Sequence, residues 1–251
     1  MQQIDSNLYF GPCPIRALAF EDKPDQLLKS VQARKGIFTS FSALFHKDWA
    51  AGLTRDTKDW KTCPGAYLHG VTNPSLAGWR SDFLRQREKL PIVSVKVFPD
   101  LHGYGLRPLR EAAKFAHEQD LPLVIMRRLV DDRLVPAWWK PRPKPLAKVL
   151  AAVQGLEAPH VIFSNFQPRE LDEVMASKAA SPHWRYEVGS FTPSSFWFSS
   201  LDQRNAVSSL LYGSGAPLYY PAGSLMIERS GLSIPKIKDI LFDNAKLCYA
   251  L

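Results

Sequence analysis

The sequence predicts an α/β fold, a single (β/α)8 TIM barrel that spans residues 1–251 as one domain. Eight short apolar segments rich in β-branched and aromatic residues recur along the chain, and their starting points lie 23 to 39 residues apart. A strand–helix–strand unit needs roughly 30 residues, so this spacing is typical of repeated βα units. The segments are mostly apolar rather than alternating, which is expected of strands covered on both faces.

The predicted strands begin near Gln3, Gly36, Ala66, Ile92, Leu121, His160, Arg185 and Ser208. We expect the first strand near residues 3 to 9 and the last near residues 208 to 213. Residues 43–64, which mix tryptophan, glycine, proline and charges, are expected to form an excursion after the second strand. An open doubly wound sheet is the alternative arrangement of the same units.

Helices are predicted between the strands. The clearest is 106–119, because its leucines and alanines fall on one stripe. Segments 145–154 and 168–177 each begin with proline, which is tolerated in the first helical turn. Ser233 is a suitable N-cap for the last helix. Eight such units in about 250 residues have the proportions of a (β/α)8 barrel.

Composition excludes several classes of protein. Hydrophobic residues make up 45% and charged residues 22%, as in a globular protein with a sizeable core. No run approaches the roughly 18 apolar residues of a membrane span, and the first residues lack the pattern of a secretory signal. Three cysteines without CxxC spacing fit a reduced protein better than a disulfide framework or a zinc site. We therefore expect a cytoplasmic protein without membrane contact.

The net charge of +8 is concentrated in one segment. Residues 127–148 contain seven basic and two acidic residues, a net charge of +5. Such a segment can attract an anionic small molecule, face nucleic acid, or simply be a solvated loop, which is the commonest case. Because no nucleic-acid-binding motif accompanies it, we do not expect nucleic acid as the partner.

The order of short motifs along nearly the whole chain resembles one enzyme family. The motifs are IDSNLYFGP (4–12), GVTNP (70–74), VKVFPDLHGYGLRP (95–108), LPLVIMRRLVDDR (121–133), LLYGSGAPL (210–218) and ILFDNAKLCYAL (240–251). In this order they resemble strands one, three, four, five and eight and the closing helix of the amidohydrolase superfamily. The similarity is to its amidohydrolase-related branch of TIM-barrel metal-dependent hydrolases, and it implies the same fold.

The resemblance also implies a divalent metal ion, which imidazoles from strands one, five and six and a carboxylate from strand eight would hold. The corresponding positions here are Asn7, Tyr9, Met126, Ser164 or Asn165, and Gly215. An amide oxygen and a thioether are poor ligands for zinc, and glycine cannot act as a base. We therefore expect no metal ion at these positions and no cofactor.

Polar residues remain at the predicted C-terminal strand ends, where barrel enzymes place their active sites. His102 and Lys96 are the catalytic candidates, because His102 can exchange protons near neutral pH and Lys96 can pair with substrate. Each has a structural alternative: Lys96 must find a partner if it is buried, and His102, which precedes Gly103, can be a turn residue.

An anionic small molecule is the predicted ligand. The candidate binding residues are Arg128, Asn7, Tyr9, Tyr104 and Arg133. A guanidinium at a strand end is the usual partner of a carboxylate or phosphate. With equal weight, Arg128 and Arg133 could form an ion-pair network with Asp131 that braces the loop.

Two classes of function follow. The first is a divergent amidohydrolase-like hydrolase, or a C–C or C–N lyase, that acts on an anionic small molecule without the usual metal. The second is a non-catalytic homologue that binds a ligand, or that pairs with itself or with an active relative. A cavity shared by Lys96, His102 and Arg128 would favour the enzyme. A barrel plugged by Tyr9, Phe98 and Met126 would favour the homologue.

Overall fold

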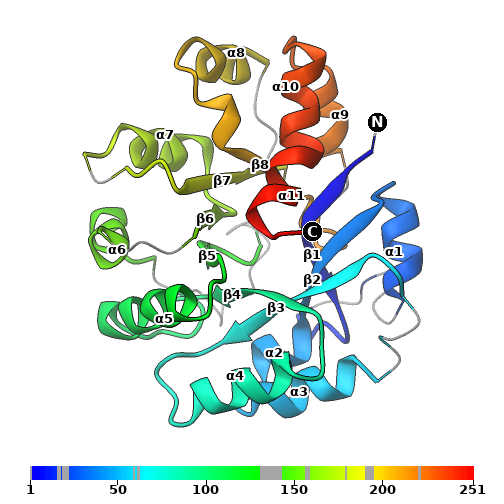
Figure 1. Ribbon diagram of the computed structural model, residues 1–251, viewed down its shortest axis with the longest axis vertical. Helices are drawn as coiled ribbons and strands as arrows, with labels where there is room; N and C mark the ends of the chain where they lie inside the picture. The colour runs from blue at the N-terminus through cyan, green and yellow to red at the C-terminus, as the bar shows by residue number, and fades with distance from the viewer. Residues whose placement is uncertain are drawn as a thin grey trace. The chain divides into compact units, whose positions relative to one another are not determined.

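The predicted barrel is confirmed. The computed structural model describes residues 2–15, 18, 23–58, 60, 63–130, 143–155, 159–178, 180–189, 195–219 and 222–251. Eight strands form one sheet in the order β1 to β8, with helices interleaved along the chain (Figure 1). This sequential order excludes the doubly wound alternative, in which the strand order reverses. The chain divides into two compact units, Met1–His69 with Glu187–Leu251, and Gly70–Tyr186.

The first unit contains both ends of the chain. Its elements are β1 (Ile4–Phe10), α1 (Pro24–Ser30), β2 (Lys35–Ser40), α2 (Phe41–Phe45), α3 (Trp49–Asp56), α8 (Ser195–Gln203), η2 (Val207–Ser209), β8 (Leu210–Tyr212), α9 (Gly223–Glu228), α10 (Ile234–Lys238), η3 (Asp239–Asp243) and α11 (Asn244–Cys248). β1 pairs with β2 in parallel, and α11 packs against β1 and β8. The first and last strands lie within two residues of their predicted bounds.

The second unit contains the middle of the barrel. Its elements are α4 (Trp79–Arg87), β4 (Ile92–Val97), α5 (Leu106–Glu118), β5 (Leu123–Met126), α6 (Leu146–Val153), β6 (Val161–Ser164) and α7 (Pro168–Ala176). The parallel pairs β4–β5 and β5–β6 align their C-terminal ends. Strands β3 (Ala66–Thr72) and β7 (Trp184–Val188) each contribute residues to both units.

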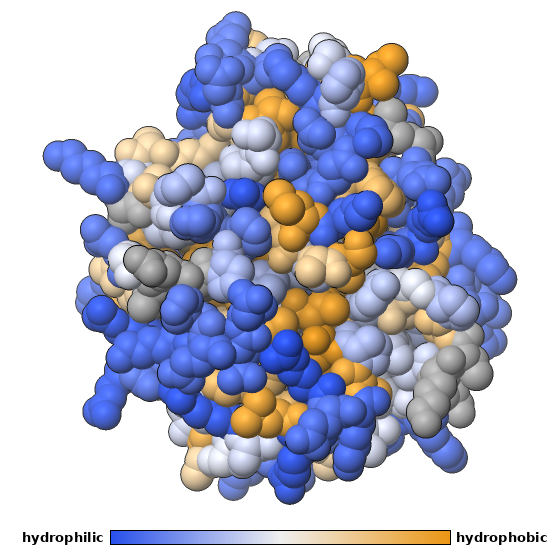
Figure 2. All heavy atoms as spheres, viewed as in Figure 1, coloured by the Kyte–Doolittle hydropathy of each residue, from blue (hydrophilic) through white to orange (hydrophobic). Residues whose placement is uncertain are grey.

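Helix α5 shows why the predicted pattern holds. Its apolar stripe, including Leu109, Ala113 and Phe115, is buried. The Phe115 ring meets Trp79 and Phe83 of α4 edge to face, at centroid distances of 4.9 and 5.2 Å. The molecular face in Figure 2 is largely hydrophilic, as expected where helices turn their polar sides to solvent. No helix within the described ranges has the length and apolar character needed to cross a membrane.

Candidate functional site

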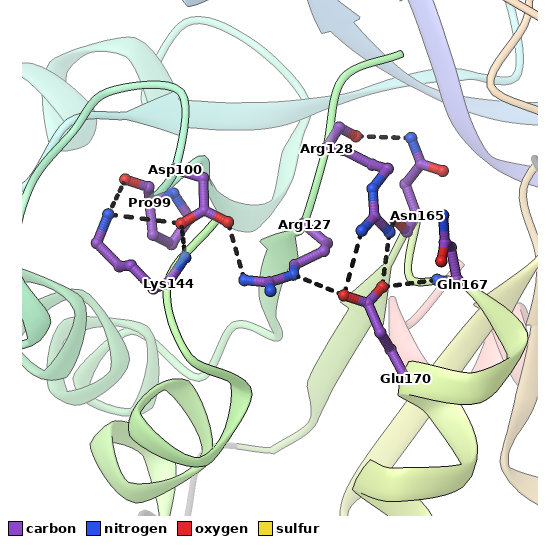
Figure 3. Close-up of polar contacts among 8 residues, drawn as sticks. All are labelled: Pro99, Asp100, Arg127, Arg128, Lys144, Asn165, Gln167 and Glu170. Atoms are coloured by element: carbon purple, nitrogen blue, oxygen red, sulfur yellow. Dashed lines mark hydrogen bonds and ion pairs between the residues drawn. The ribbon is translucent and has the colours of Figure 1, made fainter. Parts of the chain in front are cut away.

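Two arginines directly follow β5 and share one carboxylate (Figure 3). Arg128 Nη1 donates to Glu170 Oε2 at 2.6 Å, and Arg128 Nη2 donates to Oε1 at 3.1 Å. Arg127 Nε donates to the same Oε1 at 3.0 Å. Glu170 is held on the first turn of α7, where its side chain also accepts the Gln167 backbone N–H in a capping box. Arg128 and Glu170 therefore form a bidentate, charge-assisted ion pair, which is stronger than a hydrogen bond between neutral groups.

A second carboxylate extends this network. Asp100, just after β4, accepts from Arg127 Nη1 at 2.9 Å and from the Lys144 backbone N–H at 2.8 Å. The Lys144 ammonium donates to the Pro99 carbonyl at 2.7 Å and lies 3.5 Å from Asp100 Oδ1. Charges therefore alternate in sign from Lys144 through Asp100, Arg127 and Glu170 to Arg128. These contacts connect the segments that follow β4 and β5 with the start of α7.

The network is largely removed from water. The side chains of Asp100 and Arg127 are only 5% and 8% exposed. Removing the partner of either charge would therefore destabilise the folded protein strongly. Burial acts to raise the pKa of Glu170, but hydrogen bonds from Arg128, Gln167 and Arg127 and the charge of Arg128 outweigh it, and the pKa is lowered. Glu170 therefore remains ionised near neutral pH.

Arg128 therefore pairs with a residue that the sequence did not point to. The predicted bracing partners, Asp131 and Arg133, lie outside the described residues, and so does Arg133 as a candidate ligand-binding residue. Glu170 lies at the N3 position of α7, where a glutamate predicts a capping box. This local pattern does not predict an ion pair with an arginine 42 residues earlier in the sequence. A ligand-binding role for Arg128 stays a prediction.

The structure brings together Lys96, His102 and Tyr104 around Phe98. Lys96 lies on β4 with no exposed surface, and its Nζ is 5.7 Å from the Phe98 ring centroid. The His102 ring lies 6.0 Å from Phe98 and 6.3 Å from Tyr104, between centroids. Burial, and then the charge of Asp100, raise the pKa of Tyr104 well above its usual value, so its hydroxyl stays protonated. Among them these residues supply an ammonium, an imidazole and a phenol.

His102 also has the turn geometry that was its structural alternative. Its backbone N–H donates to the Phe98 carbonyl at 3.0 Å, and that of Gly103 donates to the Pro99 carbonyl at 3.1 Å. Gly103 has a φ of +70°, which favours glycine. The turn explains the backbone conformation at His102. A catalytic role for the His102 side chain stays a prediction.

The first unit holds a separate polar cluster on β1 and β7. Asn7 Nδ2 donates to Glu187 Oε1 at 2.9 Å, and both side chains are buried. The Tyr9 ring stacks on Phe41 with 5.3 Å between centroids. Burial, then the charges of Glu187 and Tyr219, raise the pKa of Tyr9 well above its usual value, while a hydrogen bond with Asn7 acts in the opposite direction. The Tyr9 phenol is therefore neutral and remains a hydrogen-bond donor.

Backbone contacts hold this cluster beside the segment that follows β8. Asp5 Oδ1 accepts from the backbone N–H groups of Asn7 and Ser214, at 3.1 and 3.0 Å. The Gly215 N–H donates to the Asn7 carbonyl at 2.8 Å, and the Tyr9 N–H donates to the Ala216 carbonyl at 2.9 Å. Glu187 was not among the predicted site residues, although an acidic residue within the buried strand β7 is a signal that the sequence contains.

The donors at the positions that resemble metal ligands do not fit the family's histidine-rich site. Asn7 directs its amide nitrogen at Glu187, and Asn165 directs its own at the Arg128 carbonyl at 2.6 Å. Ser164 Oγ contacts Met126 Sδ at 3.5 Å. Among the residues that the structure describes, no three His, Cys, Asp or Glu side chains gather as a metal would require.

These contacts predict the outcome of a metal analysis. We expect protein purified without chelator, from medium supplemented with zinc and manganese, to contain much less than one equivalent of metal, because amide and thioether groups bind such ions weakly. Elemental analysis by plasma mass spectrometry measures this directly. Stoichiometric metal that disappears in the Asn7→Ala variant would show that the prediction is wrong.

The sequence matches no protein-family model and no curated protein. Solved structures share its fold. A 2,6-dihydroxybenzoate decarboxylase from Rhizobium has a TM-score of 0.69 and 11% identity over 100% of this chain and 99% of that one. A 5-carboxyvanillate decarboxylase from Novosphingobium aromaticivorans, complexed with manganese and 4-hydroxy-3-methoxy-5-nitrobenzoic acid, has a TM-score of 0.68 and 11% identity over 100% and 96%. An amidohydrolase from Mycobacterium avium subsp. paratuberculosis has a TM-score of 0.58 and 13% identity over 91% and 76%. The resemblance to amidohydrolase-superfamily barrels is thus confirmed for the fold.

Proposed function

We propose that this chain is a hydrolase or a C–C or C–N lyase that acts on an anionic small molecule. The observation that carries the proposal is the burial of Lys96, Tyr9 and Glu187, each at most 1% exposed and each one residue before the end of its strand. Barrel interiors are normally filled by branched apolar side chains, and active sites lie at the C-terminal strand ends. Buried polar and charged groups at this level cost stability, so a function is the better explanation for them.

The finer proposal is an aromatic carboxylate as substrate. Lys96 offers an ammonium for a carboxylate, and the neighbouring Phe98, His102 and Tyr104 rings offer surfaces for an aromatic ring. Two of the decarboxylases with this fold are named for aromatic acids. In a decarboxylation the ring carbon takes a proton while its bond to the carboxylate breaks, and that electron pair returns to the ring as CO2 leaves. His102 is the residue of this group that can hold such a proton near neutral pH.

The second candidate is a non-catalytic homologue. The observation in its favour is that Tyr9, Phe98 and Met126 are each only 1% exposed, as expected of side chains that fill a barrel interior. The arginines after β5 are also already paired with Glu170 and Asp100. Such a protein would keep the barrel and could still bind a ligand or pair with another chain.

A ligand panel separates the two candidates. At ten times its Kd, a bound carboxylate should stabilise the protein by about 1.4 kcal/mol, whereas an unbound analogue should not. We expect 2,6-dihydroxybenzoate or benzoate to raise the melting temperature and benzamide, which is neutral, to have no effect. Lys96→Met should abolish the response, and CO2 release measured in parallel detects turnover. Carboxylate binding without chemistry on any panel member would favour the homologue, and no binding at all would reject the anionic ligand.

A further inference from the structure

We propose that Asp100 is a positioning residue for the reaction proposed above: it holds the turn of residues 98–103 against the residue that follows β5, and so fixes the place of the His102 imidazole. The inference rests on the proposed function and gives Asp100 a role beyond its ion pairs. All the residues that carry it lie in the second unit, Gly70–Tyr186.

The first step is the position of the Asp100 carboxylate, which donors from two other segments hold (Figure 3). Arg127 Nη1 donates to Oδ2 at 2.9 Å, and the Lys144 backbone N–H donates to Oδ1 at 2.8 Å. Each carboxylate oxygen thus has its own partner, 27 or 44 residues further along the chain. Because the side chain is only 5% exposed, water competes little for these contacts. The carboxylate is therefore fixed in position and in orientation.

The second step is the turn to which Asp100 belongs. The turn closes on itself, because the His102 N–H donates to the Phe98 carbonyl at 3.0 Å. The Lys144 ammonium donates to the Pro99 carbonyl at 2.7 Å, so Lys144 contacts two successive residues of the turn. The shape of the turn follows from its own backbone contacts. Its place beside the end of β5 depends on the contacts of Asp100 with Arg127 and Lys144.

The third step leads to the His102 ring, two residues after Asp100. Its centroid lies 6.0 Å from that of Phe98 and 6.3 Å from that of Tyr104. His102 is the member of this group that can hold a proton near neutral pH. A displacement of about 1 Å at a reacting group can lower a rate about a hundredfold. The place of the turn should therefore affect the proposed reaction directly.

A purely structural role for Asp100 makes a different prediction. Two apolar side chains can often replace a buried ion pair at little cost in stability, whereas removing one partner leaves the other charge unpaired. If Asp100 only braces the barrel, the double variant Asp100→Leu/Arg127→Met should regain both the stability and the kcat of wild type. If Asp100 positions His102, stability should return and kcat should stay low, because apolar contacts do not hold the turn in the same place.

The experiment measures CO2 release from 2,6-dihydroxybenzoate by the folded variants. Asp100→Leu should lower kcat about a hundredfold. The same variant should change KM by less than about threefold, because Lys96, the proposed partner of the carboxylate, lies on β4 and not on the turn. Asp100→Asn keeps the size of the side chain and one accepting oxygen, so kcat should fall only about tenfold.

A double-mutant cycle with His102→Ala tests whether Asp100 acts through the imidazole. In that background, Asp100→Leu should lower the remaining kcat by less than about threefold, because the group that Asp100 positions is already absent. The matched control is Glu111→Leu, which removes a 3.0 Å ion pair with Arg80 in the same unit. It should leave kcat at the wild-type value.

A wild-type kcat in folded Asp100→Leu overturns the inference alone. So does a wild-type kcat in Asp100→Leu/Arg127→Met, or an undiminished effect of Asp100→Leu in the absence of His102. If Asp100→Leu does not fold, the double variant takes its place, and Asp100→Asn takes the place of both if neither folds. If wild-type protein releases no CO2 from any carboxylate of the panel, the proposed decarboxylation fails and the inference fails with it.

Discussion

Glu170→Ala should lower the free energy of unfolding by about 3 kcal/mol, the lower end of what breaking a buried ion pair costs. The change removes the carboxylate that Arg127 and Arg128 share and leaves two guanidinium groups, 8% and 15% exposed, close together. Urea denaturation measures the difference. The control is Glu173→Ala on the same helix, because Glu173 is 55% exposed and pairs only loosely with Arg169, at 3.5 Å. An exposed pair of this kind contributes about 1 kcal/mol or less.

The stabilisation that Glu170 provides should also depend on pH, in a direction that its pKa determines. The pKa of Glu170 is lowered in the folded protein, so its contribution to stability is fully present above the usual value of 4.5 and is lost as pH falls through the folded pKa. Glu170→Gln keeps a side-chain oxygen for the helix cap but cannot ionise. Wild type should therefore be more stable than this variant at pH 7, and the gap should narrow below pH 4.5. Parallel stability curves down to the most acidic pH would show that Glu170 contributes no charge interaction.

The ion-pair network of Glu170, Arg127, Asp100 and Lys144 could not be predicted from the sequence, although the fold could. The barrel could be predicted because periodicity is local: the apolar stripe of α5 and the apolar run of β4 each identify their own element. From the same local logic, Lys96 could be placed near the end of β4. The partners of Arg127 and Lys144, in contrast, are carboxylates 27 to 44 residues away along the chain. Nothing in the spacing along the sequence determines which segments meet after the strands end.

Glu187 was missed for a related reason. The strand that contains it is recognised by its apolar neighbours, and a single carboxyl within such a run does not identify its own partner. Asn7 was recognised only as the replacement of a metal-ligating histidine. That comparison indicates that a metal ligand is missing, but it does not predict which residue the asparagine contacts. The structure supplies the missing fact, a 2.9 Å hydrogen bond between residues 180 positions apart. The role of a polar residue inside a barrel strand can therefore be inferred only when the residue that it contacts on another strand is known.

Arg128→Ala should weaken the binding of 2,6-dihydroxybenzoate by about 1.5–3 kcal/mol, the contribution of a hydrogen bond to a charged group. This corresponds to a Kd about 10 to 150 times higher. Arg128 follows directly on β5, where barrel ligands bind, and its side chain keeps 15% of its surface exposed although Glu170 engages two of its nitrogens. Arg128 Nη1 also donates to the Asn165 carbonyl at 3.2 Å, and a guanidinium presents five N–H donors in all.

Because Arg128 also pairs with Glu170, its removal should reduce stability whether or not it binds ligand, so the Kd decides between the two roles. Arg128→Lys keeps the charge and loses the bidentate geometry, and it should recover only part of the affinity. Arg169→Ala, at a side chain 92% exposed on α7, is the matched control and should leave the Kd unchanged. If the Arg128→Ala variant is less stable but binds 2,6-dihydroxybenzoate as tightly as wild type, Arg128 only braces the strand end. The anionic ligand would then depend on Lys96.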